Sequence, residues 1–262
     1  MTWWEGLVLG LVQGLTEFLP VSSSGHLVLT STAFGVDTPG VLVEVVLHVG
    51  TLLAVVLVYW RRLLALVDGA VRGRREAWIY LGLLALATIP AGLVGLLLKD
   101  FFERAFDSLF LVGVDFLVTG TILWSTRTRM TGAASERPSP VGAFGIGVAQ
   151  AFAILPGISR SGTTVTAAVW MGIDPVRAAE FSFLMALPAI AGAAVLQLGD
   201  LDAGMAGLSS GPLVVGFLSS LVAGVLAIRF LLLLLRRRAF HRFAPYLWTL
   251  GTLTVAWALL GS

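Results

Sequence analysis

Six long apolar stretches limit what this chain can fold into, because each approaches the roughly 20 residues that an α-helix needs to cross a bilayer. Apolar residues make up 57% of the 262 residues and charged residues only 12%, whereas a soluble domain carries roughly a quarter. The chain has no Cys, so disulfide-framed folds are excluded as well. The sequence therefore predicts an all-α polytopic membrane protein. Its predicted spans are Val43–Trp60, Ile79–Leu98, Leu109–Trp124, Ala178–Leu196, Pro212–Leu235 and Ala244–Leu260.

Two further apolar stretches are interrupted by polar turns. The first, Trp4–Leu29, contains Pro20 and the run Ser22–Gly25. The second, Val141–Trp170, contains the run Pro156–Gly162. Each pattern predicts two helical arms of about 10–15 residues, which are too short to cross a bilayer alone. We therefore expect re-entrant hairpins, because irregular backbone is tolerated at membrane depth only where protein or a wet cavity surrounds it.

The basic residues gather in three loops that this topology places on one side. Cytoplasmic loops carry an excess of Lys and Arg, so Arg61–Arg75, Arg127–Arg137 and Arg236–Arg242 are expected in the cytoplasm. Both termini then lie outside, provided that each hairpin returns to the side it entered. Topology thus accounts for the arginines, and we expect no nucleic-acid partner.

The two interrupted stretches resemble each other. Gln13 aligns with Gln150, and Ser24-Gly25 aligns with Ser161-Gly162, each 137 positions later. Each half holds one hairpin and three spans, and an odd number of spans inverts the second half, as in many secondary transporters. The polar turns of the two halves are expected to meet inside the membrane. The predicted single membrane domain, 1–262, divides into repeat one, a linker and repeat two, at residues 1–126, 127–139 and 140–262.

The first polar turn carries ionisable groups at membrane depth, where they are costly and usually mark function. Gln13 and Glu17 are four residues apart and share a helix face. Glu17 could hold a cation or act as a base, and His26 could serve as nucleophile or proton donor. The hydroxyls that could cradle an anion belong to Ser22, Ser23 and Ser24. The alternative is a structural turn whose polar groups bond to one another.

The second polar turn contains one basic residue, Arg160. A guanidinium at membrane depth needs an anion, and its planar fork suits phosphate. Gly162 lets the backbone approach a ligand, and a helix that opens at Thr163 would add the positive end of its dipole. The hydroxyls nearby belong to Ser159, Ser161, Thr163 and Thr164. The alternative is that Arg160 pairs with a Glu only to hold the fold.

Five more polar residues in apolar segments are left open between lining the site and holding the fold. Glu44 and Glu180 occupy matching positions near the start of two spans, and His48 follows Glu44 by one helical turn. Gln150 mirrors the Gln of the first hairpin, and Asp115 lies inside a span, where a carboxylate is expected to be functional or paired.

Together the two turns predict a buried site with a carboxylate, a His, an Arg and several hydroxyls. That set suits a phosphate ester or anhydride, with Arg160 holding the anion and Mg²⁺ or Ca²⁺ on Glu17 assisting. A wholly aqueous substrate would not require a site in the membrane, so the predicted substrate is a lipid phosphate.

These motifs resemble those of the undecaprenyl-diphosphate phosphatase family, also called the bacitracin-resistance protein family. The resemblance covers nearly the whole chain and rests mainly on Gln13–His26 (QGLTEFLPVSSSGH) and Pro156–Thr164 (PGISRSGTT). It implies a bacterial inner-membrane enzyme that removes the terminal phosphate from a C55 isoprenyl diphosphate and so recycles the lipid carrier for peptidoglycan. It also implies two inverted, interdigitated repeats and a site that opens outward. A homodimer is a further expectation.

The resemblance assigns activity residue by residue to Gln13, Glu17, Ser23, His26, Ser159, Arg160, Ser161 and Thr164. One position departs from the common form, because the first acidic site is often Glu and is Gln13 here. Glu17 is then the one carboxylate of the pair, which weakens a metal site built on two carboxylates.

Two rival functions follow from the same residues. A lipid-phosphate flippase could use the same inverted-repeat site without breaking the anhydride bond. A second lipid phosphatase superfamily also has a Ser-Gly-His element, but no His follows Ser159-Arg160 before His241, so we reject it. Within the phosphatase reading the nucleophile is left open among His26, Ser23 and water.

Overall fold

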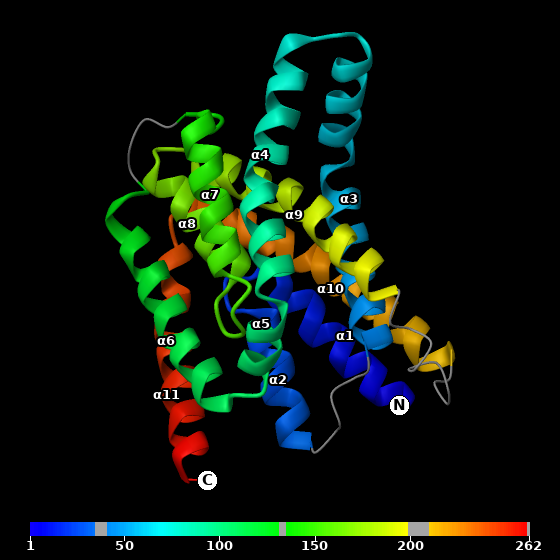
Figure 1. Ribbon diagram of the computed structural model, residues 1–262, viewed down its shortest axis with the longest axis vertical. Coiled ribbons are helices and arrows are strands. Elements are labelled where there is room, and N and C mark those ends of the chain that lie inside the picture. The colour runs from blue at the N-terminus through cyan, green and yellow to red at the C-terminus, as the bar shows by residue number, and fades with distance from the viewer. Residues whose placement is uncertain (35–40, 131–134, 199–209, 261–262) are drawn as a thin grey trace.

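The computed structural model describes residues 1–34, 41–130, 135–198 and 210–260. Within these ranges the chain is helical apart from turns and one isolated bridge between Ser135 and Ile173. Residues 131–134 of the predicted linker lie outside the described part. Two short 3-10 helices, η1 and η3, cover Ser125–Thr128 and Phe240–Phe243. The α-helices in Figure 1 are α1 (Trp3–Phe18), α2 (Ser23–Phe34), α3 (Val41–Val71), α4 (Arg75–Leu97), α5 (Lys99–Phe106), α6 (Leu109–Trp124), α7 (Pro140–Phe152), α8 (Arg160–Trp170), α9 (Pro175–Leu198), α10 (Ser210–Arg236) and α11 (Ala244–Leu260).

Five helical segments of the described part are long and apolar enough to cross a membrane. They cover five of the six predicted spans, which confirms a multi-pass α-helical membrane protein. The remaining predicted span corresponds to α9, a 24-residue helix that is not among the five. The five segments are Leu42–Val71, Arg75–Leu97, Leu109–Thr128, Ser210–Arg236 and Phe240–Leu260.

Both interrupted stretches form a short helix, a turn and a second short helix, as predicted. The arms α1 and α2 have 16 and 12 residues, and α7 and α8 have 13 and 11. A capping box of Thr2 and Glu5 starts α1, and Ser139 with Pro140 starts α7. The helix α8 begins at Arg160, three residues earlier than expected, because the Ser159 side chain caps it.

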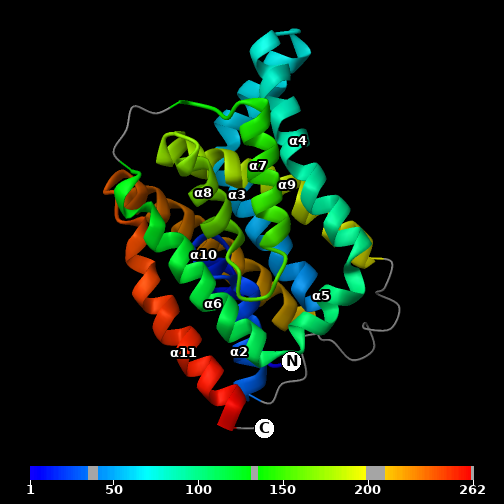
Figure 2. The ribbon, with the colours of Figure 1, turned by 60° about the vertical axis from the view of Figure 1, so that its left-hand side comes forward.

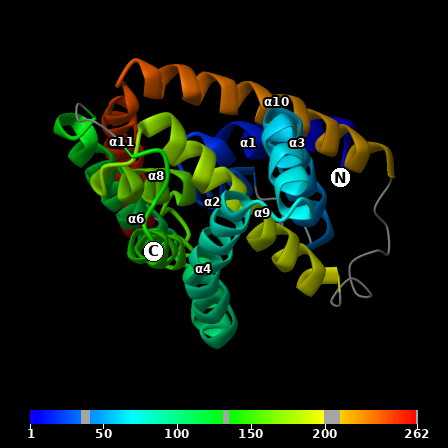
Figure 3. The same cartoon turned by 90° about the horizontal axis from the view of Figure 1, so that it is seen from above.

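The two halves of the chain interdigitate. The first hairpin arm α1 packs along α10 of the second half, while α7 packs along α4 of the first half. Figure 3 shows α1 running beside α10, and Figure 2 shows α6 beside α11, the last helix of each half. The start of α1 and the end of α11 lie at the end of the molecule opposite the α3–α4 turn (Figure 1).

The contact between α1 and α10 depends on glycines spaced four residues apart, Gly6, Gly10 and Gly14. A Cβ placed on Gly10 would lie 2.3 Å from the Gly216 carbonyl oxygen and 2.0 Å from the Ser219 hydroxyl. Small residues allow this close backbone approach between membrane helices. The first hairpin is thereby held against the second half of the chain.

Replacing Gly10 with Val is expected to destabilise the fold by about 1–3 kcal/mol, because the added side chain forces two backbones apart. The measurement is thermal unfolding of the purified protein in detergent. Gly82→Val in α4 is the matched control, since a Cβ on Gly82 meets nothing within 4 Å. Equal melting temperatures for the two variants would contradict this account of the contact.

Candidate active site

The second arms of both hairpins begin with the same hydrogen-bonded turn. In the first hairpin the Ser22 hydroxyl accepts from the Gly25 amide at 3.4 Å and lies 3.2 Å from the Ser24 hydroxyl. In the second, the Ser159 hydroxyl accepts from the Gly162 amide at 3.1 Å and lies 3.3 Å from the Ser161 hydroxyl. The two turns thus match residue by residue. Ser23 and Arg160 hold the same position, at the first residue of α2 and of α8.

The second turn has a backbone that requires glycine. Gly157 has a φ of +102°, and a Cβ there would lie 2.6 Å from the Val112 carbonyl oxygen. Thr119 of α6 fixes this turn, since its hydroxyl donates to the Gly157 carbonyl at 2.9 Å and accepts from the Ser159 amide at 3.1 Å. In the first turn Ser22 has a φ of 68°, a strained conformation of the kind found at functional sites.

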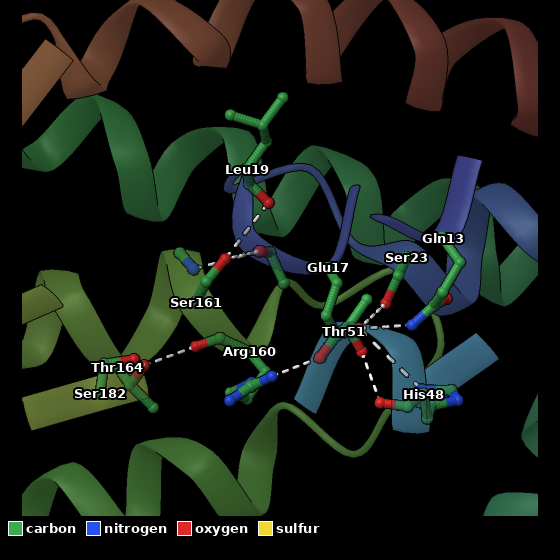
Figure 4. Close-up of polar contacts among 12 residues, drawn as sticks. Gln13, Glu17, Leu19, Ser23, His48, Thr51, Arg160, Ser161, Thr164 and Ser182 are labelled. Carbon is green, nitrogen blue, oxygen red and sulfur yellow. Dashed lines mark hydrogen bonds and ion pairs between the residues drawn. The ribbon is translucent and has the colours of Figure 1, made fainter. Parts of the chain in front are cut away.

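The Glu17 carboxylate joins the two turns (Figure 4). Its Oε2 accepts from the Ser23 hydroxyl at 2.6 Å and from Gln13 Nε2 at 3.1 Å. Its Oε1 forms an ion pair with Arg160 Nη2, and His48 Nε2 lies 4.0 Å from Oε2. The two polar turns therefore meet, and Ser23 and Arg160 bind opposite oxygens of one buried carboxylate.

A pocket with a volume of about 170 Å³ opens beside this cluster. Polar side chains of both turns form one part of its wall, and Phe106, Ile154 and Ile158 form an apolar part. Its polar lining consists of Thr16, Glu17, Ser22, Ser23, Ser24, His48, Ser159 and Arg160. An apolar wall beside a charged one suits a molecule with an anionic head and a hydrocarbon chain.

Three buried polar atoms on the two hairpins have no hydrogen-bond partner within the described part of the chain: Arg160 Nη1, the Thr163 hydroxyl and Gln13 Oε1. Of these three residues, Arg160 lines the pocket. A buried polar group without a partner costs free energy, so Arg160 Nη1 is a donor that a ligand in the pocket could satisfy. The α2 and α8 N-termini also begin at the pocket wall, and helix N-termini attract anions.

Other predicted site residues face their neighbours instead of the pocket. The Ser161 hydroxyl donates to the Leu19 carbonyl at 3.2 Å and so ties the second turn to the first. The Thr164 hydroxyl lies 2.6 Å from the Ser182 hydroxyl and donates to the Arg160 carbonyl. Gly162 packs closely against Ser159, because a Cβ added at this glycine would lie only 3.1 Å from the Ser159 side chain. These residues hold the second turn in place.

His26 is not among the residues that line the pocket. Its Nδ1 bonds to the Ser22 carbonyl at 2.8 Å, and its Nε2 lies 2.7 Å from the Tyr246 hydroxyl. The ring stacks on Tyr246 and meets Phe116 edge-on. The catalytic role predicted for His26 stays a prediction, and both of its ring nitrogens are engaged here.

Of the five residues left open by the sequence, His48 lines the pocket and the other four, Glu44 included, do not. Glu180 pairs with Arg62 at 2.8 Å and with Arg177 at 3.0 Å, so it holds the fold. Asp115 and Gln150 are buried, each with side-chain atoms that lack a partner, and neither lines the pocket. The sequence singled out His48 because it follows Glu44 by one helical turn, but it did not show which way the ring points.

The residues around Glu17 fit a divalent cation only with help from a ligand. No group of three or more His, Cys, Asp or Glu that could hold a metal is present in the described ranges. Gln13 is fully buried, does not line the pocket and directs its Nε2 at Glu17, so Glu17 is the one carboxylate that a cation in the pocket could meet. Mg²⁺ is usually held by one or two carboxylates together with substrate phosphates, and a single carboxylate is the least that such a site needs.

Comparison with known proteins places the chain in a family. The family model described as "Bacitracin resistance protein BacA" matches residues 6–253. The chain is 42% identical to the undecaprenyl-diphosphatase of Carboxydothermus hydrogenoformans, with 96% of this chain and 95% of the relative covered. It is 44% identical to the undecaprenyl-diphosphatase of Desulfosudis oleivorans, with 96% and 97% covered. It is 41% identical to undecaprenyl-diphosphatase 4 of Bacillus thuringiensis, with 97% of each covered. With a match over nearly its whole length, the chain belongs to the bacitracin resistance protein family.

Proposed function

We propose that this protein hydrolyses undecaprenyl diphosphate to undecaprenyl phosphate and phosphate within the bacterial inner membrane. The relatives described above carry the name of that activity. The observation that carries the proposal is the ion pair between Glu17 and Arg160, because it joins the two hairpin turns at a pocket. In this proposal, recycling the lipid supplies the carrier for peptidoglycan synthesis, and the family description names bacitracin resistance.

The terminal phosphate binds at Arg160. The unpartnered Nη1 donates to one phosphate oxygen, and a guanidinium paired with phosphate is a strong charge-assisted contact. The N-termini of α2 and α8 add the positive ends of two helix dipoles. The hydroxyls of Ser22, Ser24 and Ser159 complete the anion site. The first part of the isoprenyl chain packs against the apolar wall of the pocket.

Ser23 is the nucleophile that this geometry favours. Its hydroxyl donates to Glu17 at 2.6 Å, which is the distance expected between a nucleophile and its base. The Ser23 oxygen attacks the terminal phosphorus, its proton passes to Glu17, and the bond to the bridging oxygen breaks. Lipid monophosphate leaves and takes the proton from Glu17, while Arg160 balances the charge on the transferred group.

Water completes the reaction. It attacks the phosphoserine and gives a proton to Glu17, and Glu17 returns a proton to the Ser23 oxygen as inorganic phosphate leaves. One water molecule is consumed for each anhydride bond broken. A single carboxylate thus serves both halves of the reaction.

A divalent cation, Mg²⁺ or Ca²⁺, is part of the proposal. Glu17, which lines the pocket, would hold it together with substrate phosphate oxygens. When bound, it would polarise the phosphoryl group as a Lewis acid. Gln13, four residues earlier on the same helix face, holds the Glu17 carboxylate in position through its Nε2.

The membrane arrangement that we propose is a single domain of two inverted repeats, residues 1–126 and 140–262. The matching turns at Ser22–Ser24 and Ser159–Ser161 support it, and so do the reciprocal contacts of α1 with α10 and of α7 with α4. Both hairpins are then re-entrant, both termini lie outside, and the pocket opens outward. A homodimer is compatible with this arrangement.

The experiment that tests the function is phosphate release from purified undecaprenyl diphosphate by the wild-type protein. We expect turnover, and intact substrate after prolonged incubation would contradict the proposal. Reconstituted vesicles separate hydrolysis from the flippase alternative, to which the named relatives give no support. Labelled lipid that crosses the bilayer without losing phosphate would favour a flippase, and hydrolysis without crossing would exclude it as the main role.

A further inference from the structure

His48 lines the pocket and has one ring nitrogen for which the described residues provide no hydrogen-bond partner. The side chain is 33% exposed and lines the same pocket as Glu17, Ser23 and Arg160. Its Nδ1 lies 2.8 Å from the Glu44 carbonyl oxygen, which can only accept, so Nδ1 carries the proton. Nε2 is therefore left for the pocket, and at 4.0 Å from Glu17 Oε2 it is too far away for a hydrogen bond.

His48 and His26 differ in the partner of their Nε2 atoms. Both direct Nδ1 to a backbone carbonyl four residues earlier. His26 Nε2 then meets the Tyr246 hydroxyl at 2.7 Å, whereas His48 Nε2 has only the distant carboxylate. His48 is thus the imidazole that a ligand in the pocket can reach without breaking an existing hydrogen bond.

The charges of the pocket wall point to a ligand with two anionic centres. Among the described side chains that line the pocket, Arg160 and His48 are the two that can carry a positive charge. In Figure 4 the Glu17 carboxylate lies between them, with the guanidinium on one side and the imidazole on the other. A single phosphate bound at Arg160 leaves His48 unused, while a diphosphate offers a second group for it.

We infer that His48 binds the second phosphate of the substrate, the one that stays on the lipid, and so positions the diphosphate for attack by Ser23. Its Nε2 accepts from a protonated phosphate oxygen or, as imidazolium, donates to an ionised one. The carbonyl of Glu44 holds the ring in the required orientation. This inference rests on the proposed function, because it concerns the headgroup of the same substrate.

The experiment compares inorganic pyrophosphate with inorganic phosphate, measured as binding to the purified protein by calorimetry. We expect His48→Leu to weaken pyrophosphate binding by about 10- to 100-fold, as for a lost hydrogen bond to a charged group. Phosphate binding should stay within about twofold, since phosphate occupies the Arg160 side alone. With lipid diphosphate the same variant should raise KM much more than it lowers kcat.

Two variants separate binding from folding. His48→Gln keeps a side-chain donor and acceptor and should recover most of the affinity for pyrophosphate. His241→Gln is the matched control, because His241 lies in η3 against Trp124 and does not line the pocket. It should leave both binding constants unchanged.

The inference fails if His48→Leu binds pyrophosphate like the wild type, or if it loses phosphate and pyrophosphate equally. It also fails if His48→Gln is as weak as His48→Leu. A wild-type protein that binds pyrophosphate but releases no phosphate from the lipid contradicts the proposed function instead, since calorimetry reports on His48 without turnover.

Discussion

Replacing Arg160 with Ala is expected to lower kcat/KM for phosphate release by at least about 10²–10³-fold, the effect of removing one group that stabilises transition-state charge. Arg160 carries the unpartnered Nη1 beside the pocket and is paired through Nη2 with Glu17. Its removal takes away the donor for the phosphate and leaves a buried carboxylate without its counter-charge. The measurement is phosphate release from undecaprenyl diphosphate in detergent micelles.

Arg160→Lys tests whether charge alone is sufficient. Lys keeps the positive charge but has no planar fork that can reach Glu17 and phosphate together. We expect it to recover only a small part of the lost activity. Arg137→Ala, on an exposed arginine of the linker region, is the control and should behave like the wild type. Near-full turnover by Arg160→Ala, in a protein that folds normally, would rule out this site.

Replacing Glu17 with Gln should lower kcat by about 10²–10⁴-fold, the usual contribution of a positioned base. Gln has nearly the same shape and can still accept from the Ser23 hydroxyl, but it cannot take the proton. Single-turnover kinetics with the lipid substrate would show the loss in the chemical step.

The control for Glu17→Gln is Glu136→Gln, the same change on an exposed residue that does not line the pocket. It should retain wild-type kinetics. If Glu17→Gln changed KM alone and left kcat intact, Glu17 would be a binding residue and the base would have to lie elsewhere.

The hydrophobic pattern predicted most of the fold. Long apolar stretches predict helices because, in lipid, an α-helix can pair all of its backbone N–H and C=O groups within one segment. The polar interruptions predicted both hairpins, and the recurrence of Ser-Gly in both turns predicted that they are alike. The structure gives both turns the same hydrogen bonds. The start of α8 was placed three residues late, because Ser159 acts as its cap and brings Arg160 into the first turn.

The candidate site was predicted in composition and only partly in arrangement. The sequence placed Glu17 and Arg160 in one site, but a direct pair of Arg160 with a Glu was only the alternative to phosphate binding, and the sequence did not say which Glu it would be. The direction of a side chain on a short helix depends on neighbours that come from distant parts of the chain. The Tyr246 hydroxyl contacts His26, and the Ser182 hydroxyl contacts Thr164. No local sequence pattern predicts either contact. For the same reason the orientation of His48 toward the pocket required the fold.

The central claim is that the diphosphate head lies between the two hairpin turns, against Arg160 and beside Ser23. The most direct test is an experimental structure of the protein with a lipid methylenediphosphonate, whose P–C–P bridge resists hydrolysis. We expect the terminal phosphonate within hydrogen-bond distance of Arg160 and the Ser23 hydroxyl, in the pocket lined by Glu17 and Ser159. A headgroup bound elsewhere, with the Glu17–Arg160 pair closed and the pocket free of phosphonate, would contradict the account.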